Sequence, residues 1–100
     1  MARFDIVVPH TLTQEEAVRR VRGEIENLKR QYGDRISNLW DNWDNNTYAF
    51  EGVAKGFAVS GVMMVKPSQI EIAGNLPWLV LPFKGRIEAT IRERLRTLLA

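Results

Sequence analysis

His10 is the residue most open to a chemical role, because it is the only histidine and lies between two expected elements, where loops often present functional side chains. Its acidic neighbours along the chain are Asp5, Glu15 and Glu16, and there is no cysteine. A zinc site needs several protein ligands, which one imidazole with these neighbours does not supply. We therefore expect His10 to hydrogen-bond to nearby backbone and to bind no metal, and any further role of this loop is left open.

Other patterns typical of catalysis or cofactor binding are missing. No serine lies in a Gly-x-Ser-x-Gly pattern, and Ser60-Gly61 falls within an expected strand. Gly52, Gly56 and Gly61 lie among strands rather than between a strand and a helix N-terminus, so they do not form a phosphate-binding loop. The lack of cysteine excludes disulfides, thiolate zinc sites and iron–sulfur clusters. The sequence predicts no catalytic residue and no cofactor, and hence a protein that is not an enzyme.

The aromatic residues of the central region could stack on nucleotide bases, as in sheets that bind single-stranded RNA. They are Trp40, Trp43, Tyr48, Phe50 and Phe57. Acidic side chains are interleaved with them, and residues 33–75 carry three basic and five acidic groups, where a base-binding sheet would be basic. We therefore expect these rings to pack in a core and predict no nucleic acid partner.

The first two elements are a strand and a helix. Residues 3–8 alternate with the period of a half-buried strand, which Pro9 ends. Thr13 to Glu16 has the form of a capping box, in which the Thr13 hydroxyl accepts from the Glu16 amide, so a helix begins there. Its apolar stripe consists of Val18, Val21, Ile25, Leu28 and Tyr32. Gly33 is expected to end the helix in a left-handed conformation.

From residue 36 the apolar period falls to two and turn residues recur, which predicts strands near 37–43, 47–52, 57–65 and 69–74. A second amphipathic helix is expected from about Pro77 to Leu99, kinked or restarted at Pro82, which lacks an amide. The order β-α-β-β-β-β-α predicts an α+β two-layer sandwich, an antiparallel sheet with both helices on one face. That order is similar to a shortened helix-grip fold.

The sheet face away from the helices is expected to be more apolar than a solvated face. By alternation it carries Val7, Trp40, Ala49, Ala58, Val62 and Met64. Self-association is the simplest way to cover such a face. We therefore predict a homodimer with Trp40, Val62 and Met64 at its interface.

The segment from Leu76 to Phe83 is apolar on all sides and precedes a basic helix. Residues 76–100 carry five basic and two acidic groups, a net charge of +3 (5 − 2). An apolar segment beside cations can dock onto an amphiphilic surface. The candidate surface-binding residues are Trp78, Arg92, Arg94 and Arg96. The alternative, which the pattern favours, is that the segment is the buried start of a core helix.

Length and composition are those of one globular domain over residues 1–100, with a mass of 11.5 kDa and a net charge of +2. Arg3 and Asp5 interrupt the apolar residues at the N-terminus, so no signal peptide is indicated. The longest uncharged apolar run is too short to span a bilayer. We expect a soluble, cytoplasmic protein without a transmembrane segment.

These residues together resemble the small bacterial polyhydroxyalkanoic acid system proteins, over nearly the whole chain. The matching positions are Ile6-x-x-Pro9-His10-x-Leu12, Glu16-Ala17, Tyr32-Gly33, Trp43, Phe50, Gly56, Gly61, Leu76-Pro77, Phe83 and Ile87. Pro9-His10 and Leu76-Pro77 are the most specific. That family is named for genes beside those for storage-polyester synthesis and granule-surface proteins. The resemblance implies a role in that system, but it supplies no catalytic residues.

Two functions follow from the residues and the resemblance. The first is a non-enzymatic accessory protein of polyhydroxyalkanoate metabolism that works at or near the granule, with the granule surface or granule proteins as partners. The alternative is a small soluble carrier that binds an apolar or hydroxyacyl ligand between sheet and helices. Trp43, Phe50, Phe57 and Phe83 are all expected to point inward, so we expect a filled interior, which disfavours the carrier.

Overall fold

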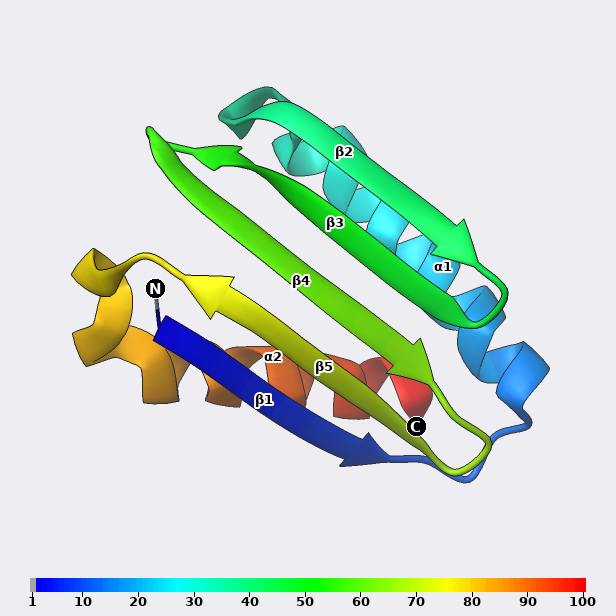
Figure 1. Ribbon diagram of the computed structural model, residues 1–100. Helices are drawn as coiled ribbons and strands as arrows, with labels where there is room; N and C mark the ends of the chain where they lie inside the picture. Colours follow the sequence, from blue (N-terminus) through cyan, green and yellow to red (C-terminus); the bar gives the residue numbers. More distant parts are fainter. Residues whose placement is uncertain (1) are drawn as a thin grey trace.

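The computed structural model describes residues 2–100, and its strands and main helices follow the order β-α-β-β-β-β-α (Figure 1). The strands are β1 (Ala2–Pro9), β2 (Ile36–Asp44), β3 (Thr47–Ala54), β4 (Phe57–Val65) and β5 (Gln69–Leu76). The α-helices are α1 (Gln14–Tyr32) and α2 (Lys84–Leu99), and the short 3₁₀ helices are η1 (Gly33–Arg35) and η2 (Trp78–Phe83). The predicted α+β fold is therefore confirmed.

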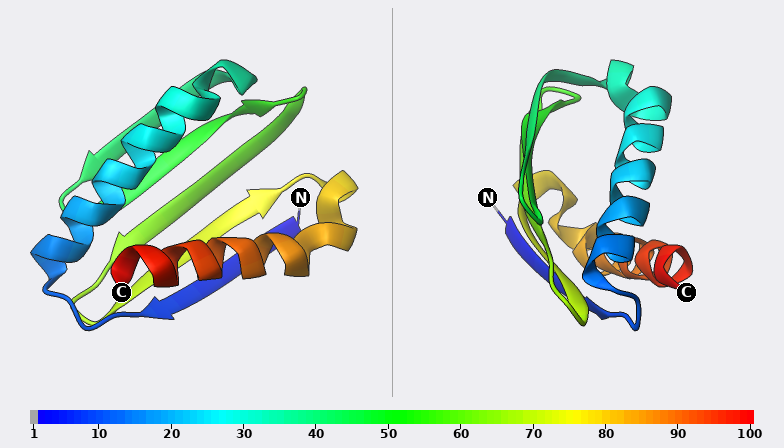
Figure 2. Two further views of the ribbon diagram at one scale, coloured as in Figure 1. Left: turned by 180° about the vertical axis from the view of Figure 1, so that it is seen from behind. Right: turned by 90° about the vertical axis from the view of Figure 1, so that its right-hand side faces the viewer.

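The five strands form one antiparallel sheet in the order β1-β5-β4-β3-β2. The four later strands are a meander, and β1 pairs with the last of them, so the two ends of the β region lie side by side. Both helices cover one face of this sheet and leave the other face open (Figure 2). This is the predicted two-layer arrangement.

The core lies where the first half of α1 and the second half of α2 meet the sheet. Alternate residues of β1, among them Phe4, Ile6 and Val8, are buried there. Their helical partners include Val21 of α1 and Leu95 of α2. Because a strand buries every second side chain and a helix buries a stripe, these residues are the ones that the two periods place on facing surfaces.

The ends of the helices show two confirmed predictions and one error. The hydroxyl of Thr13 accepts a hydrogen bond of 3.1 Å from the Glu16 amide, as the capping box predicted. Gly33 was expected in a left-handed conformation, but its φ is −61° and it continues into η1. The first residue with positive φ after the helix lies further on, at Asn38 in β2 (φ 53°), within a bulge that shifts the register between Ser37 and Trp40. Pro82 does restart the helix, since η2 ends and α2 begins just after it.

Candidate functional site

The two helices are splayed: they meet at one end of the sheet and diverge toward the other (Figure 2). At the meeting end, Nη1 of Arg20 donates to the backbone oxygens of Leu98 (3.1 Å) and Ala100 (2.8 Å), at the end of α2. One turn further along α1, Glu24 pairs with Arg94 of α2 at 2.9 Å. These polar contacts join the helices near their meeting point, and the sheet lies uncovered between them where they diverge.

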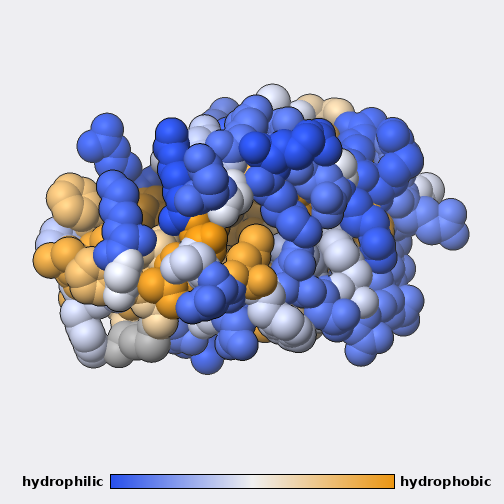
Figure 3. Space-filling view, turned by 90° about the horizontal axis from the view of Figure 1, so that it is seen from above, coloured by the Kyte–Doolittle hydropathy of each residue, from blue (hydrophilic) through white to orange (hydrophobic). Residues whose placement is uncertain are grey.

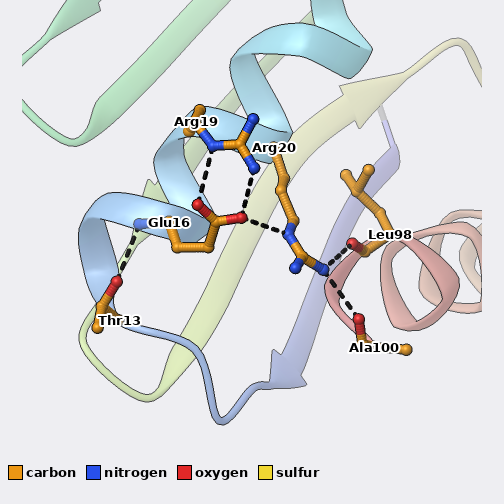
Figure 4. Close-up of polar contacts among 6 residues, drawn as sticks. All are labelled: Thr13, Glu16, Arg19, Arg20, Leu98 and Ala100. Carbon is orange, nitrogen blue, oxygen red and sulfur yellow. Dashed lines mark hydrogen bonds and ion pairs between the residues drawn. The ribbon is translucent and has the colours of Figure 1, made fainter.

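A carboxylate holds Arg20 in this position (Figure 4). Glu16 accepts from Arg19 at 2.6 Å and from Arg20 at 2.8 Å, and its own amide is capped by Thr13. The hydrogen bonds from Arg19 and then from Arg20 lower the pKa of Glu16 to about 2. The carboxylate is therefore ionised at neutral pH, and it links the start of α1 to the end of α2 through one guanidinium.

The rings of Phe4 and Phe50 lie over the uncovered part of the sheet, and we call these two rings the aromatic floor. Four residues lie opposite one another on neighbouring strands: Phe50 of β3 pairs with Gly61 of β4, Gly61 with Gly74 of β5, and Gly74 with Phe4 of β1. A Cβ built on Gly61 would lie 2.7 Å from Cε1 of Phe50, and one built on Gly74 would lie 2.5 Å from Cε1 of Phe4. The two rings thus occupy the space above the glycine pair that side chains would otherwise fill. Larger residues at these two positions would raise the floor.

Above this floor lies an apolar groove of about 390 Å³ between the helices and the sheet. Its walls come mainly from the second half of α1, from α2 and from β2, and they include Ile25, Leu28, Tyr32, Ile36, Leu39 and Ile91. Figure 3 shows hydrophobic atoms gathered around a hollow at the same end of the molecule as η2 in Figure 1. Binding pockets for small ligands usually measure about 300–1,000 Å³, so the groove has the size of a small ligand site.

The expected filled interior is therefore wrong. Trp43 and Phe50 do point inward, with Trp43 packed against the core and Phe50 lining the groove. Phe83 is 57% exposed and Phe57 is 43% exposed, so these two rings do not fill the space between the layers. Phe83 is exposed because it ends a separate 3₁₀ helix instead of lying in the apolar stripe of one long amphipathic helix.

One polar cluster borders the groove, and sequence reasoning missed it. The carboxylate of Asp41 accepts from Nζ of Lys29 at 3.0 Å and from the hydroxyl of Tyr48 at 2.9 Å. Burial raises the pKa of Asp41, but the hydrogen bonds from Lys29 and Tyr48 outweigh it, so the pKa is lowered overall. Burial, and then the bond to Asp41, raises the pKa of Tyr48. Asp41 occupies an inward position of β2, which the alternation around Trp40 and Trp43 would have indicated.

The segment that the sequence favoured as buried is exposed. In η2, Trp78 is 66% and Leu79 is 67% exposed, and Leu81 and Phe83 are exposed as well. A short 3₁₀ helix on the surface touches the rest of the molecule along one side, so a segment that is apolar on every side leaves its other side chains in water. We call these four residues the apolar turn. It lies at the end of the molecule where the helices diverge (Figure 2).

The candidate arginines are not all beside the apolar turn. Arg94 pairs with Glu24, and a helix of 3.6 residues per turn places Arg92 and Arg96 on the opposite side from it. Arg92 and Arg96 lie about 12–18 Å along α2 from Lys84, at 1.5 Å per residue. The cations next to the turn in sequence are Lys84 and Arg86, and no ion pair involves either of them within residues 2–100.

The candidate dimer residues lie where alternation placed them. Trp40, Val62 and Met64 are exposed on the sheet face that the helices leave open, and Trp40 is 52% exposed. Val7 on β1 is exposed on the same face. These side chains are spread over β2, β4 and β1, with Glu71 of β5 paired between Met64 and Val7 and Glu51 of β3 paired with Trp40. We call this side of the sheet the outer face.

His10 is a structural residue of the loop after β1. The ring is buried, and its Nε2 lies 2.9 Å from the carbonyl oxygen of Lys66, to which it donates, while its amide donates to Ser68 at 2.9 Å. The loop after β1 is thereby joined to the turn between β4 and β5. Within residues 2–100, no group of His, Asp and Glu side chains is arranged to hold a metal ion.

The comparisons with known proteins give one match. A family model described as "Putative polyhydroxyalkanoic acid system protein" matches residues 4–99. No curated protein and no solved structure matches the chain. Of the helices in residues 2–100, none has both the length and the apolar character needed to cross a membrane.

Proposed function

Because the chain belongs to the polyhydroxyalkanoic acid system protein family, we propose that it is a non-enzymatic accessory protein of polyhydroxyalkanoate metabolism that acts at the granule surface. The family ties the chain to the polyester system. The place of action rests on the apolar turn, the observation that carries this proposal.

The apolar turn has the properties of a surface anchor. Its four large side chains are exposed together in one short segment, with Trp78 and Leu79 about two-thirds exposed. Tyr32 and Phe57, which end α1 and begin β4, are also exposed. Burial of one such side chain contributes about 1.5–3 kcal/mol. Insertion of several at the boundary between polyester and water would therefore hold the protein there.

Cations at this end suit an anionic coat on the granule. Lys84 and Arg86 follow the turn directly, and Arg35 and Lys55 belong to η1 and to the turn before β4. An apolar segment flanked by basic side chains is the arrangement by which monotopic proteins bind anionic interfaces. Arg92 and Arg96 would contribute at longer range.

A binding role rather than catalysis fits the polar groups near the groove. Lys29, Asp41 and Tyr48 bond to one another, and His10 bonds to backbone. Lys29, Asp41 and Tyr48 thus each have a structural partner, whereas His10 lies outside the groove lining and its buried Nδ1 has no hydrogen-bond partner within residues 2–100. We therefore propose that this chain does not carry out a reaction itself.

We also propose that the protein is a homodimer through the outer face. Trp40, Val62 and Met64 would leave water together in such a pairing. Two sheets can pack face to face about 10 Å apart. In that arrangement the apolar turns, which lie at the end of each molecule where the helices diverge, stay free for the granule.

The carrier is a second candidate, and the open groove favours it. A carrier needs an apolar volume between sheet and helices, and about 390 Å³ is present there. Transfer of a hydroxyacyl unit to or from a granule would use both the groove and the turn, which lie at the same end (Figure 3).

Co-sedimentation with purified polyhydroxyalkanoate granules tests the granule proposal. Trp78→Ala should lower the bound fraction roughly tenfold at both low and high salt, since the lost interaction is apolar. Trp40→Ala, compared at the same oligomeric state, removes an exposed indole from the outer face and should leave binding nearly unchanged. Failure of the unaltered protein to sediment with granules would refute the granule role.

A further inference from the structure

We propose that the apolar groove binds the alkyl chain of one anionic amphiphile, a fatty or hydroxy-fatty acid of medium length, with its carboxylate outside near Arg86. This inference rests on the carrier candidate and names its ligand class. It does not depend on granule binding.

The size of the groove favours a single chain. A helix about 10 Å across fills roughly 400 Å³ with each 5.4 Å turn, so the groove could take no more than one turn of a protein helix. Its volume of about 390 Å³ is instead in the usual range for a small molecule. The floor of Phe4 and Phe50 and the wall of Leu28 and Ile91 present rings and methyl groups to such a chain.

Hydrogen bonding favours hydrocarbon over peptide. The polar side chains that line the groove are Lys29, Tyr32 and Tyr48. Asp41 engages Lys29 and Tyr48, and Tyr32 is exposed to water at the end of α1. A peptide strand in the groove would bury amides and carbonyls without partners there, at a cost of about 1–3 kcal/mol each. An alkyl chain buries no polar group, so it suits this lining.

Charge favours an anionic head. Between α2 and α1, a shallow depression is lined by two cations, Arg86 and Arg94, and by two carboxylates, Glu24 and Glu93, of which Glu93 lies about two helical turns along α2 from Arg86. Arg94 is paired with Glu24, whereas Arg86 has no ion pair within residues 2–100. A carboxylate that leaves the groove beside α2 would find a free guanidinium there.

Methyl NMR of the unaltered protein locates the ligand without a mutation. Dodecanoate, kept below its micelle concentration, should shift the methyl signals of Leu28, Ile72 and Ile91. The signals of Val7 and Met64 on the outer face should not move. Shifts confined to the outer face or to Leu79 and Leu81 would overturn the groove as the site, although ligand binding itself would stand.

Chain length and head charge test the ligand class by titration. Each added methylene from octanoate to dodecanoate should raise the affinity about fourfold, until the groove is full and the gain falls. Dodecyltrimethylammonium, with the same tail and the opposite charge, should bind more weakly. Arg86→Gln should reduce the preference for dodecanoate several-fold, and Arg96→Gln should not. Equal affinity for both heads would refute the anionic assignment.

A variant with a larger side chain inside the groove tests whether the groove is the binding site. Leu28→Trp should weaken dodecanoate binding at least tenfold, while Leu79→Trp, the same change on the exposed apolar turn, should stay within about twofold of the unaltered protein. If Leu28→Trp does not fold, the methyl shifts above still decide the site. If no methyl signal shifts and calorimetric titration detects no heat of binding with any of these probes, both the groove ligand and the carrier are refuted. Shifts of the Leu28, Ile72 and Ile91 methyl signals that depend on protein concentration without ligand would show that a second copy fills the groove instead.

Discussion

Arg20 donates a hydrogen bond of 2.8 Å to the backbone oxygen of Ala100, 80 residues later in the chain. This contact fixes the point where α1 meets α2. The same guanidinium is held by Glu16, so this contact depends on an ionised carboxylate, beside the second junction of the helices between Glu24 and Arg94.

Stability should therefore fall in acid through Glu16. Its pKa is about 2 in the folded protein and about 4.5 in the unfolded chain, so its contribution is fully present above the unfolded value. It is lost as pH drops from about 4.5 toward 2. Thermal unfolding between pH 6 and pH 2 should show a smaller decline for Glu16→Gln than for the unaltered protein. Glu15→Gln, at an exposed neighbour, is the control, and identical pH profiles for all three proteins would contradict the role of Glu16.

The contact between Gly61 and Phe50 predicts that replacing two glycines by alanine has opposite effects on stability. Gly61→Ala should destabilise by about 1–3 kcal/mol, because its Cβ would force the ring of Phe50 aside. Gly23→Ala in the exposed middle of α1 meets nothing within 4 Å and should stabilise by about 0.5–1 kcal/mol. Urea titration of both variants measures this contrast. A Gly61→Ala protein as stable as the unaltered one would show that Phe50 does not depend on the gap.

The homodimer is tested by a charge on the outer face. Val62→Glu would bury an unpaired carboxylate in the interface and should yield monomers, as measured by sedimentation equilibrium. Ala89→Glu places the same charge on the exposed surface of α2 and should leave the mass unchanged. A monomeric unaltered protein at high concentration would end the dimer proposal.

Salt should separate the contributions of the cations to granule binding. Lys84→Gln with Arg86→Gln should weaken binding mainly at low salt, because salt screens charges beyond about 10 Å at 0.1 M. Arg92→Gln with Arg96→Gln should have a smaller effect, and adding Arg94→Gln also removes the pair with Glu24. If neither pair of changes alters co-sedimentation while both proteins stay folded, the granule contact uses no charge from α2.

His10 should matter for stability and not for metal. His10→Ala removes the donor to Lys66 and leaves that carbonyl unpaired, which should cost about 1–3 kcal/mol in urea titration. Thr11→Ala, at the exposed next position, is the control. Stoichiometric zinc in protein purified without added metal, lost in His10→Ala, would contradict this role.

Much of the fold could be predicted because its signals are local. The alternation in residues 3–8, the capping box at Thr13 and the restart at Pro82 each depend on neighbours within a few positions. The same alternation placed Trp40 and Val62 on the outer face. A period of two or of 3.6 determines which side of an element is apolar, and with one apolar side for each element the two-layer order followed.

The groove and the exposure of the apolar turn were decided only by the tertiary structure. Periodicity states that α1 and α2 each face the sheet, but it says nothing of the angle between them. That angle depends on contacts between distant residues, such as Arg20 with Ala100 and Glu24 with Arg94. The depth of the floor depends on Phe50 lying beside Gly61 on the next strand, a relationship set by strand register. Volumes and angles between elements arise from packing across the whole chain, and no local pattern of residues encodes them.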